Sequence, residues 1–247
     1  ENSRDSFSQQ RAQIQMLRML NQSSMIKGMN EQLWKEKIEN FEMAFRMQTS
    51  IPGVQDISNE SAATTQLYGL DQKISENFGT QCLIARRFLE QGVRFVQVTH
   101  SALKAQWDQH GNLRRDHAER AAQVDQPIAG LLTDLKQRGM LEDTLVVWAG
   151  EFGRTPTVQG PKFDGRDHNP HGFTAWLAGA GVRSGFKYGS TDEFGYYAQE
   201  NPVHVHDFHA TLLAFLGIDH EELTYHFAGR DFRLTDVHGR VINEIFA

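Results

Sequence analysis

The sequence predicts an α/β protein in which a helical N-terminal segment leads into a sheet-containing region. Apolar residues recur at helical spacing before residue 48, and β-rich runs alternate with helix-length segments after residue 76. All 11 histidines lie within residues 100–247, among carboxylates. We therefore expect residues 1–70 to form a helical support segment and residues 71–247 to form the α/β domain that carries the chemistry.

The N-terminal segment is predicted to contain two helices within residues 5–48. The run Ser-Ile-Pro-Gly at 50–53 is expected to end the second helix, and a short helix follows at 56–68. Its methionine and phenylalanine stripe is interpreted as core packing or as a surface for a partner.

The second region is predicted to alternate helices with buried strands. Helices are expected at 78–91, 114–138 and 207–216, each followed by a glycine, and strands at 93–99, 144–149 and 173–178. Such alternation is typical of a parallel sheet covered on both faces. The polar connection at 160–172 is long enough to indicate a functional loop.

Composition excludes several classes of protein. The chain has 247 residues and a net charge of -6, and no basic stripe indicates a nucleic-acid partner. No apolar run approaches the roughly 18 residues of a membrane span. The single cysteine, Cys82, excludes an intrachain disulfide.

Three short segments supply imidazole or carboxylate groups, which together are the ligand set of a borderline divalent metal. They are the Asp-x-His at 108–110, the turn GEFGRTP at 150–156 and the run GRDHNPHG at 165–172. Ligands of parallel sheets bind at the carboxyl ends of strands, where the first two segments are expected. The predicted metal ligands are Asp108, His110, Glu151 and His168, with Asp167 or His171 in support. Zn²⁺ or Mn²⁺ is favoured, and Ca²⁺ is possible.

Each segment also has a structural interpretation. Glu151 and Arg154 are spaced to form a salt bridge that closes a tight turn, and an Asp-x-His pair is common on exposed surfaces. The histidine-rich segment at 204–209 is interpreted mainly as packing and capping, with Asp207 at the N-cap of the following helix.

The motifs GEFGRTP at 150–156, GRDHNP at 165–170 and GRDFRLTDVHG at 229–239 resemble those of domain-of-unknown-function family 1501, over nearly the whole chain. That family is similar to a sulfatase-like branch of the alkaline phosphatase and sulfatase superfamily. The resemblance implies a three-layer α/β fold with a two-metal site at the strand ends. Glu151 and His168 would stand for superfamily ligands, whereas Phe152 replaces a ligand histidine.

The resemblance further implies a bacterial, periplasmic or exported, metal-dependent hydrolase of phosphate or sulfate esters, acting on a small molecule or a glycan. Arg154 and Glu151 are its expected catalytic residues. The superfamily nucleophile lies on N-terminal strands, and no such strand is predicted before Arg94. We therefore expect this chain to be a C-terminal portion that is weak or inactive alone. The alternatives are a non-catalytic exported binding protein that keeps the fold, and a metal-dependent phosphotransferase or mutase.

Overall fold

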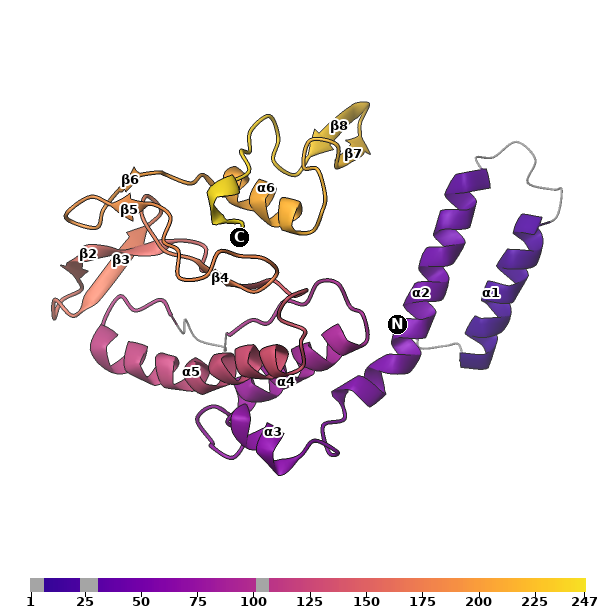
Figure 1. Cartoon of the computed structure of the whole chain (residues 1–247), viewed down its shortest axis with the longest axis horizontal. Coiled ribbons are helices and arrows are strands. Elements are labelled where there is room, and N and C mark those ends of the chain that lie inside the picture. Colours follow the sequence, from indigo (N-terminus) through magenta and orange to yellow (C-terminus); the bar gives the residue numbers. More distant parts are fainter. Residues whose placement is uncertain (1–6, 23–30, 101–106) are drawn as a thin grey trace. The chain divides into compact units, whose positions relative to one another are not determined.

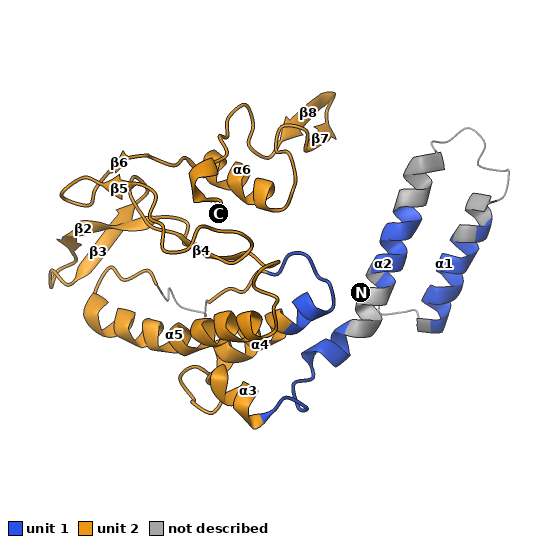
Figure 2. Ribbon diagram, viewed as in Figure 1, with its two compact units in different colours: residues 1–61, 87–96 blue, residues 62–86, 97–247 orange. Residues whose placement is uncertain are grey.

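The computed structural model describes residues 7–22, 31–100 and 107–247 and shows a mixed α/β protein, as the sequence predicts. Its chain divides into two compact units (Figure 2). Unit 1 contains residues 1–61 and 87–96, and unit 2 contains residues 62–86 and 97–247. None of the described helices is long and apolar enough to cross a membrane.

Unit 1 contains two helices that lie side by side (Figure 1), α1 (Phe7–Gln22) and α2 (Glu31–Gln55). The predicted end of the second helix at 50–53 is wrong, because α2 includes Pro52 and continues to Gln55. Arg87 stabilises this end by donating to the carbonyl oxygens of Val54 (2.7 Å) and Gly53 (2.9 Å). Carbonyls in a last helical turn lack partners within the helix, so the arginine supplies them.

The first helices of unit 2 are α3 (Ala62–Leu67), the larger part of α4 (Glu76–Glu90) and α5 (Leu113–Gln137). The predicted helices at 78–91 and 114–138 are therefore confirmed to within two residues. α4 and α5 lie close to the chain at Leu67 and Tyr68 because each presents a glycine there. A Cβ atom at Gly79 would overlap the Tyr68 carbonyl, and one at Gly130 would overlap the Leu67 carbonyl. Buried Asp134 of α5 joins this packing by accepting from the Tyr68 hydroxyl at 2.9 Å.

The strands of unit 2 differ from the predicted parallel sheet, since every described ladder is two-stranded and antiparallel. β1 (Val146–Trp148) pairs with β4 (Trp176–Ala178), which confirms two of the predicted strands in shortened form. Parallel neighbours need a long crossover, usually a helix. Between β1 and β4 the chain instead forms a hairpin, and this connection returns it antiparallel.

That hairpin consists of β2 (Gly153–Gln159) and β3 (Gly165–Asn169) (Figure 1). The segment 160–172, predicted to be a polar loop, therefore holds a turn and a strand. The predicted strand at 93–99 is not formed in the part of the chain that the structure describes. Its β-rich composition lacks a ladder partner there, and Phe95 is 77% exposed.

The C-terminal part of unit 2 contains α6 (Val205–Phe215), η2 (Asn243–Ile245) and two small hairpins. The hairpins are β5 (Ser190–Thr191) with β6 (Ala198–Glu200), and β7 (Thr224–Phe227) with β8 (Arg230–Arg233). The predicted helix at 207–216 is confirmed and begins two residues earlier. Its N-cap is His204 rather than Asp207, because Asp207 occupies the third helical position and accepts from the His204 N–H.

Candidate metal centre

Two imidazoles and a guanidinium converge on one carboxylate oxygen in unit 2. Oδ1 of Asp108 lies 2.9 Å from Nε2 of His110, 2.9 Å from Nε2 of His168 and 2.7 Å from Nη2 of Arg154. Four of the residues selected from the sequence therefore meet at one point. The two imidazole rings lie with their centroids 5.0 Å apart.

The β2–β3 hairpin explains why two of these side chains meet. Arg154 of β2 and His168 of β3 are directly opposite in the ladder. Directly opposite residues of an antiparallel pair project from the same face of the sheet, so both side chains reach the same carboxylate. Arg154 is further fixed by donating to the carbonyl oxygens of Trp107 (3.2 Å) and Arg166 (3.4 Å).

The loop that carries Asp108 and His110 is docked on β3 through its backbone. The Arg166 N–H donates to the Gln109 carbonyl at 3.1 Å, and the Leu113 N–H donates to the Asp164 carbonyl at 2.9 Å. Gly165 is required for this approach, because a Cβ atom there would overlap the carbonyl group of His110. The site thus depends on a glycine whose close contacts are with the loop backbone at His110 and Gly111.

Asp108 is held as an anion. Its hydrogen bond from His168, followed by that from Arg154, lowers the pKa of the Asp108 carboxyl to about 2. The side chain of Asp108 is 39% exposed, and those of His110 and His168 are 41% and 43% exposed. A charged carboxylate with two imidazoles at an open surface can receive a cation and still leave room for water or substrate.

The donor set fits a divalent metal. One ligand atom from each of Asp108, His110 and His168 lies within 4.8 Å of the others, and these three form the single such group among the described residues. Tetrahedral Zn²⁺ places its ligand atoms about 3.3–3.6 Å apart, so the 2.9 Å contacts need to widen by only about half an ångström. Three protein ligands with an open position is the arrangement of catalytic zinc sites.

Three predicted ligands do not join this group. Asp167 and His168 are neighbours on β3, and successive side chains of a strand project from opposite faces, so only His168 can face Asp108. His171 lies beyond the end of β3, and its ring contacts Tyr197 with centroids 5.3 Å apart. Glu151 is exposed in the bend before β2. The structure provides no ion pair between Glu151 and Arg154 in the described residues, since Arg154 binds Asp108 instead.

Two residues that were not among the predicted ligands or catalytic residues also contact the site. The ring of Phe152 packs on His168 with centroids 4.3 Å apart, and the Gln159 amide oxygen lies 2.6 Å from Nδ1 of His110. Phe152 stands beside the predicted Glu151, so its position in the motif was a usable signal. A lone glutamine at the end of a polar strand carries no such signal.

His100 belongs to a separate aromatic cluster. Its Nδ1 accepts from Nε1 of Trp107 at 2.8 Å, and its Nε2 contacts Oε1 of Gln123 at 3.0 Å. Both ring nitrogens are therefore occupied. Trp107 also contacts Trp148 at the end of β1, with centroids 6.4 Å apart, so the cluster supports the loop that carries Asp108.

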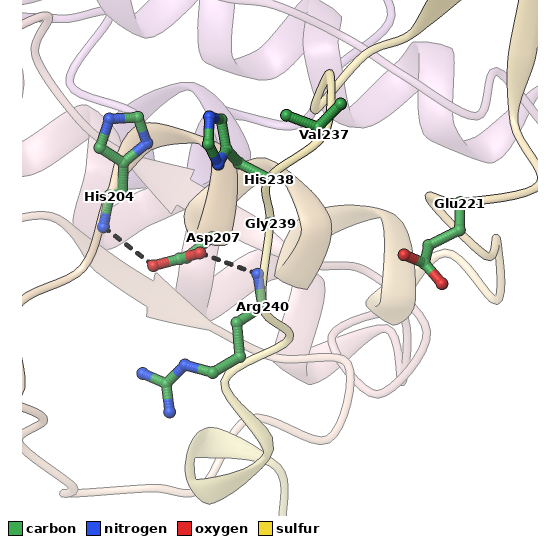
Figure 3. Close-up of a pocket in the computed structure, with 7 residues that line it drawn as sticks. All are labelled: His204, Asp207, Glu221, Val237, His238, Gly239 and Arg240. Atoms are coloured by element: carbon green, nitrogen blue, oxygen red, sulfur yellow. Dashed lines mark hydrogen bonds between the residues drawn. The ribbon is translucent and has the colours of Figure 1, made fainter.

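The C-terminal histidines border a different cavity, of about 380 Å³ (Figure 3). Figure 3 shows Asp207 between the backbone nitrogens of His204 and Arg240, which donate to it at 3.1 Å and 2.8 Å. Asp207 therefore has the structural role that was expected for this segment. The lining residues are His204, Asp207, Glu221, Val237, His238, Gly239 and Arg240, and none belongs to the metal centre.

The fold and the site together define a mixed α/β protein with a candidate two-histidine, one-carboxylate metal centre. Residues 2–246 match the model of the family described as "Protein of unknown function (DUF1501)", so the chain belongs to this family. Comparisons with curated proteins and with solved structures found no match.

Proposed function

We propose that this protein is a divalent-metal-dependent hydrolase of phosphate or sulfate esters. The observation that carries the proposal is the convergence of Asp108, His110 and His168 beside the guanidinium of Arg154. A carboxylate and two imidazoles would hold Zn²⁺ or Mn²⁺, and an arginine beside them suits a tetrahedral oxyanion. The family resemblance drawn from the motifs at 150–156 and 165–170 supports the same class of reaction.

Each residue has a distinct task in this proposal. Bound at the three ligands, a divalent cation supplies Lewis-acid polarisation of the ester oxygen and lowers the pKa of water. Arg154 donates to non-bridging oxygens as negative charge develops on them. Its contacts with Trp107, Asp108 and Arg166 use only Nη1 and Nη2, so Nε remains for substrate within the described surroundings.

Two groups that could act as a nucleophile, the Thr155 hydroxyl and the Cys82 thiol, are already engaged or protonated, which supports water as the nucleophile. Thr155 Oγ1 donates to the Thr157 carbonyl at 3.1 Å and accepts from the Asp167 N–H at 3.1 Å, so it fastens the hairpin. Burial raises the pKa of the Cys82 thiol to about 12, which keeps it protonated. Transfer through a covalent enzyme intermediate, as in a phosphotransferase or mutase, is less well supported than hydrolysis.

The finer expectations from the resemblance form part of the same proposal. They are an alkaline phosphatase-like three-layer arrangement, an exported location and a small-molecule or glycan ester as substrate. The mixed α/β fold agrees with the three-layer arrangement in its helix and strand content. Fractionation of the source cells, followed by immunodetection, tests the location independently of activity.

A binding function without catalysis is the second candidate. The observation that favours it is the exposure of the three ligands, each near 40%, because an active site that excludes water would bury them more deeply. A metal held at an open surface can recognise a glycan or an anion without converting it. Metal-dependent binding without turnover would distinguish this candidate.

The test uses the full-length protein, which is freed of metal with a chelator and then reloaded with Zn²⁺, Mn²⁺ or Ca²⁺. Aryl phosphate and aryl sulfate serve as substrates. We expect turnover of one class, abolished by Asp108→Asn and reduced about 10²–10³-fold by Arg154→Ala, as for loss of an oxyanion donor. Glu151→Gln measures whether that exposed carboxylate contributes.

Asp231→Asn is the matched control, because Asp231 forms an exposed pair with His226 at 2.6 Å and lies outside the site. It should leave turnover unchanged. If no metal supports hydrolysis of either ester, the hydrolase proposal fails. Metal binding retained under those conditions would favour the binding protein.

A further inference from the structure

We propose that Gln159 is a positioning residue that fixes the tautomer of His110 so that Nε2 is the metal-binding atom. This inference rests on the proposed metal site but concerns a residue that neither the motifs nor the ligand set includes. Gln159 Oε1 lies 2.6 Å from Nδ1 of His110, while Asp108 Oδ1 lies 2.9 Å from Nε2 on the other side of the ring.

The chemistry of the amide oxygen determines which nitrogen carries hydrogen. A glutamine Oε1 can only accept, so the short contact requires a hydrogen on Nδ1. In a neutral imidazole, Nε2 then presents a lone pair toward Asp108. That lone pair is then on the side of the ring that faces Asp108, where the two residues would hold a divalent metal.

The backbone around Gln159 fixes the amide in this position. Gln159 is the last residue of β2 and is paired with Gly165 of β3. Gly165 and Gly160 both approach the carbonyl of His110, where added Cβ atoms would collide. The turn that joins β2 to β3 therefore lies against the backbone of His110, while the Gln159 side chain contacts the His110 ring.

His168 differs from His110 in this respect. In the described part of the chain, the structure gives its Nε2 a contact with Asp108 and its ring face a contact with Phe152. Packing on Phe152 orients the ring of His168 but does not select a tautomer. Gln159 thus makes His110 the preorganised ligand of the pair, and ligand-orienting partners typically change metal affinity about 10–100-fold.

The first experiment reads the tautomer directly in the metal-free protein. Long-range ¹H–¹⁵N spectra of ¹⁵N-histidine-labelled protein are recorded at about pH 8, where ordinary histidines are neutral. The His110 signals are assigned by their loss in His110→Gln. We expect an Nδ1–H pattern in the native protein and in Gln159→Glu, and a shift toward Nε2–H in Gln159→Leu. A native Nε2–H pattern, or no change in Gln159→Leu, would overturn the proposal.

The second experiment measures Zn²⁺ affinity by competition with a chromogenic chelator. We expect Gln159→Leu to weaken binding about 10–100-fold and Gln159→Glu to restore it, since a carboxylate keeps the acceptor. Gln81→Leu is the matched control, because the same substitution removes a side-chain hydrogen bond to Asn77 on α4, at 2.9 Å, and should leave Zn²⁺ affinity unchanged. Equal affinity in native protein and Gln159→Leu would contradict the inference.

The two readouts separate this inference from the proposed function. Failure of the native protein to bind Zn²⁺ or Mn²⁺ overturns the metal-dependent hydrolase. The metal-free tautomer tests the contact between Gln159 and His110 whether or not turnover is detected.

Discussion

Arg154 and His168 face each other across the β2–β3 ladder, and both donate to Oδ1 of Asp108, at 2.7 Å and 2.9 Å. The pairing shows how a two-stranded hairpin can build half of a site by itself. One strand supplies the cation that would bind substrate oxygen, and the other supplies a ligand for metal. The remaining ligands come from a loop that is docked on the same hairpin by backbone hydrogen bonds.

This docking leads to a prediction about Gly165. In Gly165→Ala the added methyl group collides with the His110 carbonyl, so the loop must shift away from β3. We expect Zn²⁺ affinity to fall at least as much as in Gln159→Leu and stability to fall by about 1–3 kcal/mol, as for overpacking. Isothermal titration and urea unfolding provide the two measurements.

Gly111→Ala is the control, because it lies in the same loop and its Cβ would meet only Asp164 Oδ1 at 3.7 Å. That distance is an ordinary contact. If Gly111→Ala and Gly165→Ala weaken Zn²⁺ binding equally, close approach at Gly165 is not what organises the site.

Helices could be predicted from the sequence more closely than strands. Periodicity and following glycines located the helices at 78–91 and 114–138, since each buries one face and ends where a left-handed residue is needed. The hairpin could not be predicted, because residues 153–159 and 165–169 are polar and lack the alternation of a half-buried strand. The apolar run at 93–99 has the composition of a strand, but pairing depends on a partner that composition does not reveal.

The candidate site was partly predictable for a chemical reason. Asp108, His110 and His168 were selected because imidazole with carboxylate is the ligand set of a borderline divalent metal, and the structure places them together. Glu151, Asp167 and His171 were selected by the same chemistry but are separated by strand alternation and turn geometry. Which side of a strand a residue faces depends on register, and a one-residue difference reverses it.

The buried carboxylate of Asp134 leads to a prediction about stability. It accepts from the Tyr68 hydroxyl at 2.9 Å and pairs with Arg86 at 3.1 Å and Arg138 at 2.7 Å. Burial, followed by the hydrogen bond to Asp134, raises the pKa of Tyr68, so its hydroxyl stays protonated and donates. We expect Asp134→Leu to cost about 3–5 kcal/mol, since it leaves the Arg86 guanidinium buried without its carboxylate.

Tyr68→Phe should cost about 1–3 kcal/mol, because it removes one donor and leaves both arginines in place. Chemical denaturation of both variants measures the difference. If the two variants lose similar free energies of unfolding, the ion pairs of Asp134 with Arg86 and Arg138 contribute little to stability.

His100 leads to a prediction about pH. Burial, with the charge of Arg120, lowers the pKa of His100 below its usual value of 6.5. The folded protein therefore binds this proton less readily than the unfolded chain. Its stabilising contribution is complete above pH 6.5 and is lost as the pH falls from there through the lowered pKa.

Protonation of Nδ1 also removes the acceptor for Trp107 Nε1, so tryptophan fluorescence should change in the same pH range as the melting temperature. His100→Gln should flatten this part of the stability profile. An unchanged profile in that variant would assign the acid sensitivity to other groups.

The C-terminal histidines lead to the last prediction, which separates capping from metal binding. Asp207 accepts from the backbone of His204 and of Arg240, and so holds the start of α6 against the chain at 240. Asp207→Ala should therefore cost about 1–3 kcal/mol of stability, since two backbone donors lose their partner. His204→Ala should cost less, because its side chain accepts one bond, from the His206 N–H at 3.2 Å. Neither change should alter Zn²⁺ affinity, which depends on Asp108, His110 and His168. A loss of Zn²⁺ binding in folded His204→Ala would instead place a metal site at these histidines.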